Sequence, residues 1–335
     1  MLSIVIPNFA RKELTRTQFQ RRCDRLLSQK LVRFTEEEKK DIQTISKNPD
    51  LADASKKLEV FFKIKLEEIN DRVNAIYNFG WQLPRGKTTP CIKKNPRITP
   101  EKAIAIDNKI KIYREKVFKF FNNFIYKPSS NPEVIRIEKE LRKKGIKAKF
   151  SNNVSVDFAK LTAETIHDIK KRGYQLSPKI CDTPFLGFLT NAGVFIGAEK
   201  PADTIFFNST FASKTLDSIK SNQKSEYSTH FKSTDNPKHT IIHEIGHWLH
   251  SRMNLKEFFI QDICACSLVQ ANKPALSKNN IELLKNSVSG YSISNSKLGL
   301  EAVAEIFTGL IDGKKYGQRI MNIYKRLKGP IPKSN

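Results

Sequence analysis

The stretch HTIIHEIGHWLH, residues 239–250, determines how the chain is interpreted, because it holds four of the six histidines and a single glutamate. If this stretch is a helix, His243 and His247 lie four residues apart on one face, close enough for both imidazoles to bind one ion. Together with Glu244 they form the pattern H-E-x-x-H. In this pattern the two histidines hold zinc and the glutamate acts as general base toward water.

The surroundings of the motif predict a buried helix. Asn236 and Pro237 precede it, and an Asn cap followed by Pro is typical of a helix start. The other sides of this helix are apolar, and Gly246 permits the close approach of another backbone. The apolar positions are Ile241, Ile242, Ile245 and Leu249. His239 and His250 flank the motif, and we interpret them as surface or supporting histidines rather than as metal ligands.

Two histidines do not complete a catalytic zinc site, which needs three protein ligands and an open position for water. A longer zinc pattern that supplies a third histidine would require Gly at position 250 and His at position 253, where this chain has His250 and Met253. That class is excluded, and a carboxylate is the expected third ligand. Glu257 follows His247 by only ten residues, and Glu282 fits a solvated helix face.

The better candidates lie in GYSISNSKLGLEAVAEIFTGL, residues 290–310. Glu301 and Glu305 are four residues apart on a second predicted helix, in an otherwise apolar setting. The apolar neighbours are Leu300, Val303, Ala304 and Phe307. Buried carboxylates need a partner, and a dication is a strong one. Glu301 is therefore the expected third ligand. The alternative, in which both glutamates form a helix face paired with lysines, stays open.

HEIGH is followed about fifty residues later by S-x-Y, a short polar stretch and E-x-x-A-E-x-F. The two motifs together resemble the gluzincin peptidases of the anthrax-toxin lethal-factor type, which include related domains of phage structural proteins and toxins. The resemblance covers residues 140–325, and only the two short motifs in it are specific. It implies that Glu301 is the third zinc ligand and that Glu305 supports the site from behind the ligands. It also implies that Tyr291 points at the reacting oxygen.

The first 130 residues predict a helical, basic domain of unknown role. Cap signals predict helices that begin after Thr35, which forms a capping box with Glu38, after Asp50 and after Thr99. A loop rich in Pro, Lys and Thr interrupts the helices at residues 83–100. The stretch KPSSNP, residues 127–132, ends them and marks the expected domain boundary.

Residues 131–335 predict a zincin-like domain. A helix is expected after Asn131-Pro132, then a strand in IKAKFS and a helix that ends at Gly173. Three more short strands are expected in SPKICDTP, GVFIGAE and DTIFFNSTF, whereas the polar residues 213–238 predict a long loop beside the site. The expected fold class is α+β, with a small mixed sheet, the H-E-x-x-H helix and a C-terminal helical subdomain.

The net charge of +25 is concentrated in residues 1–150, which carry 35 basic and 18 acidic side chains. This surplus suits an anionic partner, but no nucleic-acid signature accompanies it, so nucleic acid is not expected. The five cysteines are scattered and predict reduced thiols. No apolar stretch of about 18 residues occurs, so no transmembrane helix is expected. We expect a cytoplasmic protein, or one exported without a cleaved signal peptide.

These observations predict a zinc-dependent endopeptidase that binds one Zn²⁺ and hydrolyses a protein or peptide substrate. One alternative is a phage- or toxin-associated scaffold protein whose zincin domain is inactive or processes only its own assembly. Another is a DNA-associated metallopeptidase anchored by the basic half of the chain. Such proteases commonly use a third histidine as ligand, and no histidine follows His250 in this sequence.

Overall fold

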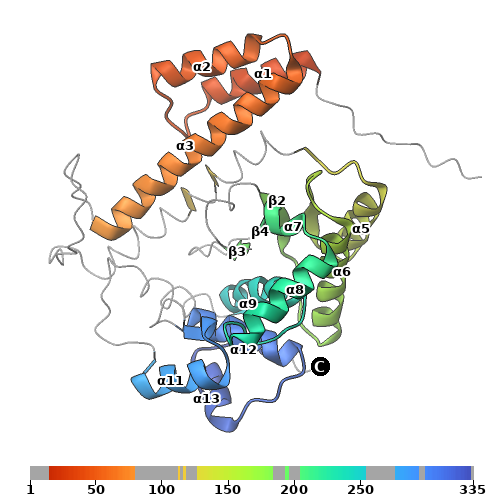
Figure 1. Cartoon of the computed structure of the whole chain (residues 1–335), viewed down its shortest axis with the longest axis vertical. Coiled ribbons are helices and arrows are strands. Elements are labelled where there is room, and N and C mark those ends of the chain that lie inside the picture. The colour runs from red at the N-terminus through yellow and green to blue at the C-terminus, as the bar shows by residue number, and fades with distance from the viewer. Residues whose placement is uncertain are drawn as a thin grey trace, which may run out of the picture.

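The computed structural model describes residues 15–79, 112–113, 116–117, 127–183, 193–195, 204–253, 276–293 and 299–332. Within these ranges the chain is mostly helical with one small sheet, which confirms the α+β class (Figure 1). Several predictions fall outside the described residues. They are the loop at 83–100, most of the helix after Thr99, the end of the strand at 193–199 and the cysteines at 91, 264 and 266.

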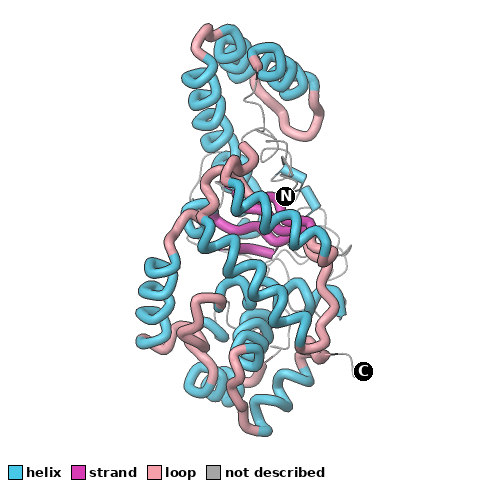
Figure 2. Tube along the Cα trace, turned by 90° about the vertical axis from the view of Figure 1, so that its right-hand side faces the viewer, coloured by secondary structure: helices cyan, strands magenta, loops and turns pink. Residues whose placement is uncertain are grey.

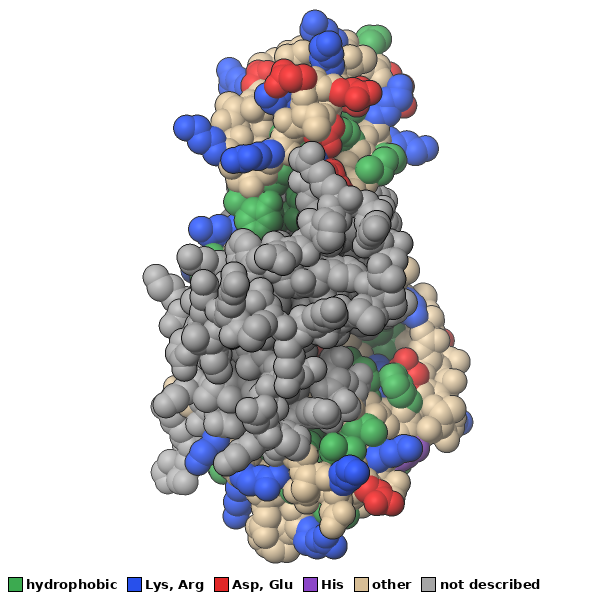
Figure 3. All heavy atoms as spheres, turned by 90° about the vertical axis from the view of Figure 1, so that its left-hand side faces the viewer, with side chains coloured by type: hydrophobic (Ala, Val, Ile, Leu, Met, Phe, Trp, Pro, Cys, Tyr) green, Lys and Arg blue, Asp and Glu red, His purple; other side chains and the backbone are tan. Residues whose placement is uncertain are grey.

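Three helices form the N-terminal part of the described chain. They are α1 (Arg16–Ser28), α2 (Glu36–Lys47) and α3 (Leu51–Phe79). The capping box predicted at Thr35 is present, because Thr35 Oγ1 accepts from the Glu38 amide and Glu38 accepts from the Thr35 amide. Asp50 accepts from the amides of Ala52 and Asp53 and so caps α3. On the face drawn in Figure 3, basic side chains of this part are interspersed with acidic ones.

In the described part of the chain the sheet has four strands, in the order β1-β2-β4-β3. They are β1 (Lys147–Lys149), β2 (Lys179–Thr183), β3 (Gly193–Phe195) and β4 (Thr204–Asn208). The first three strands in this order are parallel, and β3 joins β4 in antiparallel pairing. The strands lie between the N-terminal helices and the C-terminal group of helices (Figure 2). Strand β3 is thus the end strand of the sheet within the described residues.

Helices α5 (Pro132–Lys143), α6 (Val156–Lys171) and the short α7 (Ser209–Ala212) accompany the strands. Asn131 caps α5 through two backbone amides, and Gly173 follows α6 with a φ of 85°, a left-handed conformation that glycine adopts without strain. Both helix signals predicted from the sequence are therefore confirmed.

The two faces of the sheet belong to different clusters of buried side chains. Ile180, Ile205 and Phe207 belong to the larger core, which also contains residues of α6, α9 and α12. Cys181 and Phe206 point to the other face, since neighbours in a strand alternate, and they belong to a cluster formed mainly by α1–α3. The domain boundary at residue 130 remains a prediction, and this second cluster contains side chains from both sides of it.

The prediction of a long loop over residues 213–238 is wrong for its first half. Helix α8 (Leu216–Ser228) occupies this part, and Thr215 caps it through the Ser218 amide. Only Ile219 and Gln223 of α8 are buried, so the apolar periodicity that announces most helices is missing. Residues 229–238 contain no helix or strand and lie beside the histidine cluster, as expected.

The C-terminal group consists of helices around the H-E-x-x-H helix. They are α9 (His239–Met253), α11 (Lys278–Ser287), the 3₁₀ turn η2 (Tyr291–Ile293), α12 (Leu300–Ile311) and α13 (Gln318–Arg326). Helix α9 begins slightly later than predicted, at His239, and Asn236 caps the preceding turn through the Lys238 amide. Within the described residues, no helix combines the length and apolarity needed to cross a membrane.

Helices α9 and α12 approach closely at Gly246. A Cβ atom added at Gly246 would lie 2.9 Å from Phe307 Cδ1, and the ring of Phe307 is fully buried. We expect Gly246→Ala to lower the free energy of unfolding by about 1–3 kcal/mol, because the ring or the helix must shift. Urea denaturation followed by circular dichroism measures this change. An unaltered unfolding midpoint and slope would show that the two helices are not in tight contact.

Candidate metal centre

Three side chains predicted as metal ligands converge in the structure. His243 and His247 lie one turn apart on α9, and Glu301 lies in the first turn of α12. The Nε2 atoms of the two histidines are 3.1 Å apart. Glu301 Oε2 lies 3.0 Å from His243 Nε2 and 3.4 Å from His247 Nε2. The three atoms therefore form a nearly equilateral triangle.

This triangle fits a zinc ion. Zinc lies about 2.0–2.2 Å from nitrogen and oxygen ligands, so two ligands of a tetrahedral site are separated by roughly 3.3 Å. The observed separations of 3.0 to 3.4 Å match this value. Two imidazoles and one carboxylate are also the donor set of a catalytic zinc site, in which a fourth position stays open to water. The residues present thus fit the predicted ion.

The electrostatics of the triangle favour positive charge. Although burial alone would lower it, hydrogen bonds with Glu301 and Glu305 raise the pKa of His243 to about 10. Burial would raise the pKa of Glu301, but His247 and His243 lower it to about 2. Glu301 is therefore an ionised carboxylate directed at two imidazoles. A buried carboxylate that faces two imidazoles in this way stabilises a cation.

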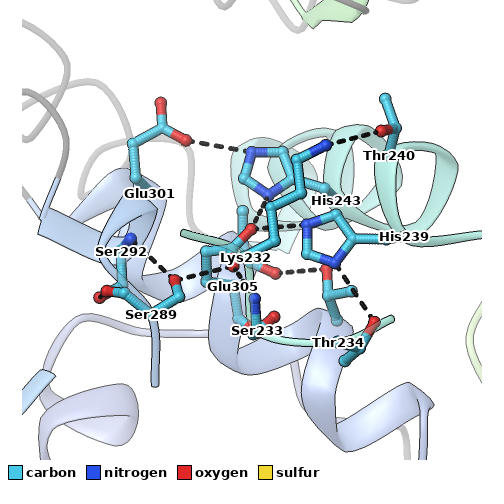
Figure 4. Close-up of polar contacts among 12 residues, drawn as sticks. Lys232, Ser233, Thr234, His239, Thr240, His243, Ser289, Ser292, Glu301 and Glu305 are labelled. Carbon is cyan, nitrogen blue, oxygen red and sulfur yellow. Dashed lines mark hydrogen bonds and ion pairs between the residues drawn. The ribbon is translucent and has the colours of Figure 1, made fainter. Parts of the chain in front are cut away.

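Glu305, one turn after Glu301 on α12, is completely buried and accepts four hydrogen bonds (Figure 4). Its Oε1 lies 2.9 Å from both His239 Nε2 and His243 Nδ1. Its Oε2 accepts from the Ser233 amide at 2.8 Å and from Ser289 Oγ at 2.9 Å. Both carboxylate oxygens are thus held by protein donors.

The contacts of Glu305 fix the tautomer of His243. Burial would raise the pKa of Glu305, but His239 and His243 hold it well below the usual value, so the carboxylate is ionised and can only accept. His243 therefore keeps a proton on Nδ1, and Nε2, which faces Glu301 and His247, is the nitrogen that can release its proton and bind an ion. This tautomer is the one that a metal at Nε2 requires.

Glu244 lies on α9 between the two histidines and is 7% exposed. Burial raises its pKa, while the charges of His243 and His247 act in the opposite direction. A carboxylate so close to the triangle, with its affinity for protons increased, suits the role of a general base.

Tyr291 begins η2, and its ring lies 5.4 Å from the ring of His243, measured between centroids. Burial raises its pKa above the usual value, and the charges of Glu301 and Glu244 raise it further. Its phenol is therefore a protonated hydrogen-bond donor near the triangle. Phe231 packs edge-on against Tyr291, with the ring centroids 5.2 Å apart.

The predicted site residues thus lie together. The alternative in which Glu301 and Glu305 pair with lysines is wrong, because their partners are histidines, serines and a backbone amide. His239 is buried against Glu305, as a supporting histidine would be, whereas His250 is buried with its Nε2 2.9 Å from the Leu327 carbonyl oxygen.

Sequence reasoning missed two donors to Glu305. Ser289 belongs to the S-x-Y pattern, so its place next to Tyr291 offered a signal. Ser233 gives its backbone amide to Glu305 Oε2 and its hydroxyl to the Glu305 carbonyl, and no residue pattern announces a backbone donor.

Comparison of the chain with protein family models, with curated proteins and with solved structures found no match.

Proposed function

We propose that the protein is a zinc-dependent endopeptidase that hydrolyses peptide bonds of a protein or peptide substrate. The observation that supports this most strongly is the triangle of His243 Nε2, His247 Nε2 and Glu301 Oε2, with edges between 3.0 and 3.4 Å. Its size suits one Zn²⁺, and the general-base candidate Glu244 follows His243 directly on the same helix.

Each residue of the site would have its own role in hydrolysis. His243, His247 and Glu301 would hold the ion, which supplies polarisation of the scissile carbonyl and a more acidic water when bound. Glu244 accepts a proton from the attacking water and passes it to the leaving amine, so the peptide bond is replaced by a carboxylate and a free amine. Glu305 keeps His243 in the tautomer that leaves Nε2 available.

Tyr291 donates a hydrogen bond to the oxygen that becomes negative during attack. We expect Tyr291→Phe to lower kcat about 10²-fold with little change in KM, because the hydroxyl acts on charge that develops only in the transition state. Steady-state kinetics on a cleaved peptide measure both constants. Tyr227→Phe is the matched control, because Tyr227 lies on α8 against Lys314. Equal kcat in wild type and Tyr291→Phe would remove Tyr291 from the reaction.

The end of the sheet offers a place for an extended substrate. Among the described strands, β3 is the last in the sheet order, and it pairs with β4 in antiparallel fashion. It also contacts α9, which carries both histidines. A peptide could add to such an edge through backbone hydrogen bonds and pass the triangle in extended form.

The direct test combines metal analysis with a search for cleavage. Purified protein should contain one zinc per chain, and incubation with a proteome digest or intact proteins should produce new termini that a chelator suppresses and added zinc restores. Zinc binding without cleavage of any protein or peptide would favour the scaffold alternative. Absence of zinc binding would contradict the proposal itself.

A further inference from the structure

His239 is buried in the candidate metal centre, although it belongs neither to the H-E-x-x-H motif nor to the triangle. It lies one turn before His243 on α9, is 1% exposed, and its ring stacks over that of His243 with an angle of 22° between the planes. Its Nε2 lies 2.9 Å from Glu305 Oε1, the same oxygen that accepts from His243. Its Nδ1 lies 3.3 Å from Thr234 Oγ1.

The hydrogen bonds determine the state of this ring. Glu305 Oε2 accepts from the Ser233 amide and the Ser289 hydroxyl, and Oε1 faces one nitrogen of each histidine ring. His239 therefore donates to this carboxylate from Nε2, and its Nδ1 then accepts from the Thr234 hydroxyl. Glu305 Oε1 therefore accepts one hydrogen bond from His239 and one from His243. Without His239, Glu305 Oε1 would lose one of its two donors and with it the fixed direction in which it meets His243 Nδ1.

We propose that His239 is a positioning residue for metal binding: it holds Glu305 so that Glu305 holds His243 with its Nε2 lone pair directed at the ion. This inference rests on the proposed zinc site. The chain of contacts then runs from the ligand His243 to Glu305, from Glu305 to His239, and from His239 to Thr234. Partners of metal ligands typically change metal affinity 10–100-fold when removed.

His239, His243 and Glu305 also lie close enough together to hold a second ion. The hydrogen bonds argue against this use. A second ion there would bind Nδ1 of His243 while the zinc binds Nε2 of the same ring, and a neutral imidazole has only one lone pair to give. Oε2 is already occupied by Ser233 and Ser289. The structure therefore assigns this group to positioning, and the zinc content should be one per chain.

The test measures zinc affinity by chelator competition in the full chain. His239→Leu removes the donor at similar volume and should weaken zinc binding 10–100-fold. His239→Gln places an amide N–H near the former Nε2 and should restore affinity to within about threefold of wild type. His250→Leu is the matched control, because His250 is equally buried on α9 but bonds to Leu327. It should leave zinc affinity unchanged.

Each result bears on the inference. Wild-type affinity in folded His239→Leu, or equal losses in His239→Leu and His250→Leu, would overturn the positioning role while the zinc site stands. A wild-type chain that binds no zinc would remove both proposals.

If His239→Leu does not fold, ¹⁵N spectra of the zinc-loaded wild type provide a second test. The inference requires a proton on Nε2 of His239 and on Nδ1 of His243. Zinc affinity in Thr234→Val should also fall, and the opposite tautomer of His239 would contradict the inference.

Discussion

Glu244→Gln is expected to keep one zinc per chain and to lose peptide hydrolysis, with kcat/KM reduced by about 10³-fold or more. Glutamine has the shape of glutamate, so the packing of α9 is preserved, and Glu244 belongs neither to the triangle nor to the contacts of Glu305. The amide cannot accept a proton from water. The loss therefore falls on the chemical step and leaves the ion in place.

Metal analysis and single-turnover cleavage of a substrate peptide measure the two quantities separately. Glu282→Gln is the matched control, since it makes the same change of charge at an exposed position of α11. Cleavage by Glu244→Gln at the wild-type rate would remove Glu244 as the base. Loss of zinc in this variant would show instead that Glu244 helps to hold the ion.

Glu301→Ala is expected to lose zinc. Removal of one of three ligands leaves two imidazoles and should reduce zinc affinity by more than the roughly 10–100-fold typical of a supporting residue. His243→Ala should have the same effect, and both variants should lose hydrolysis together with the metal. The carboxylate is needed for its charge, because it is ionised and directed at both histidines.

Chelator competition, with circular dichroism to verify folding, measures this effect. Glu301→Gln is the informative companion, because it keeps the size of the side chain but removes its charge, and it should also bind zinc weakly. Full zinc affinity in folded Glu301→Ala would show that another residue completes the site, and the proposed ligand set would then be wrong.

Local rules predicted the parts of the fold that depend on neighbours in the sequence. The caps at Thr35 and Asn131 and the stop at Gly173 each act within one turn of a helix, so they could be predicted before any packing was known. The parallel pairing of β1 with β2, in which Lys147 lies opposite Lys179, joins segments that are distant in the sequence, and no local pattern encodes it. Helix α8 was missed because only two of its side chains, Ile219 and Gln223, are buried, so its sequence shows little apolar periodicity.

The site shows the same division. The four-residue spacing of His243 and His247 predicts one helix face, and an acid in an apolar helix predicts a buried partner, which led to Glu301. The positions of Ser233 and Thr234 follow from how residues 229–238 fold back against α12 and α9. Such contacts arise from tertiary structure alone, so the sequence predicted the candidate ligands and the supporting Glu305 but not the contacts of Ser233 and Thr234.

The division of the sheet between two cores has a practical consequence for anyone who wishes to express the metal-binding part alone. A fragment that starts at residue 131 would retain the larger core but would lose the N-terminal side chains that pack with Phe206 and Cys181. Exposed apolar surface on a small sheet promotes aggregation. The N-terminal helices therefore help to keep one face of the strands buried.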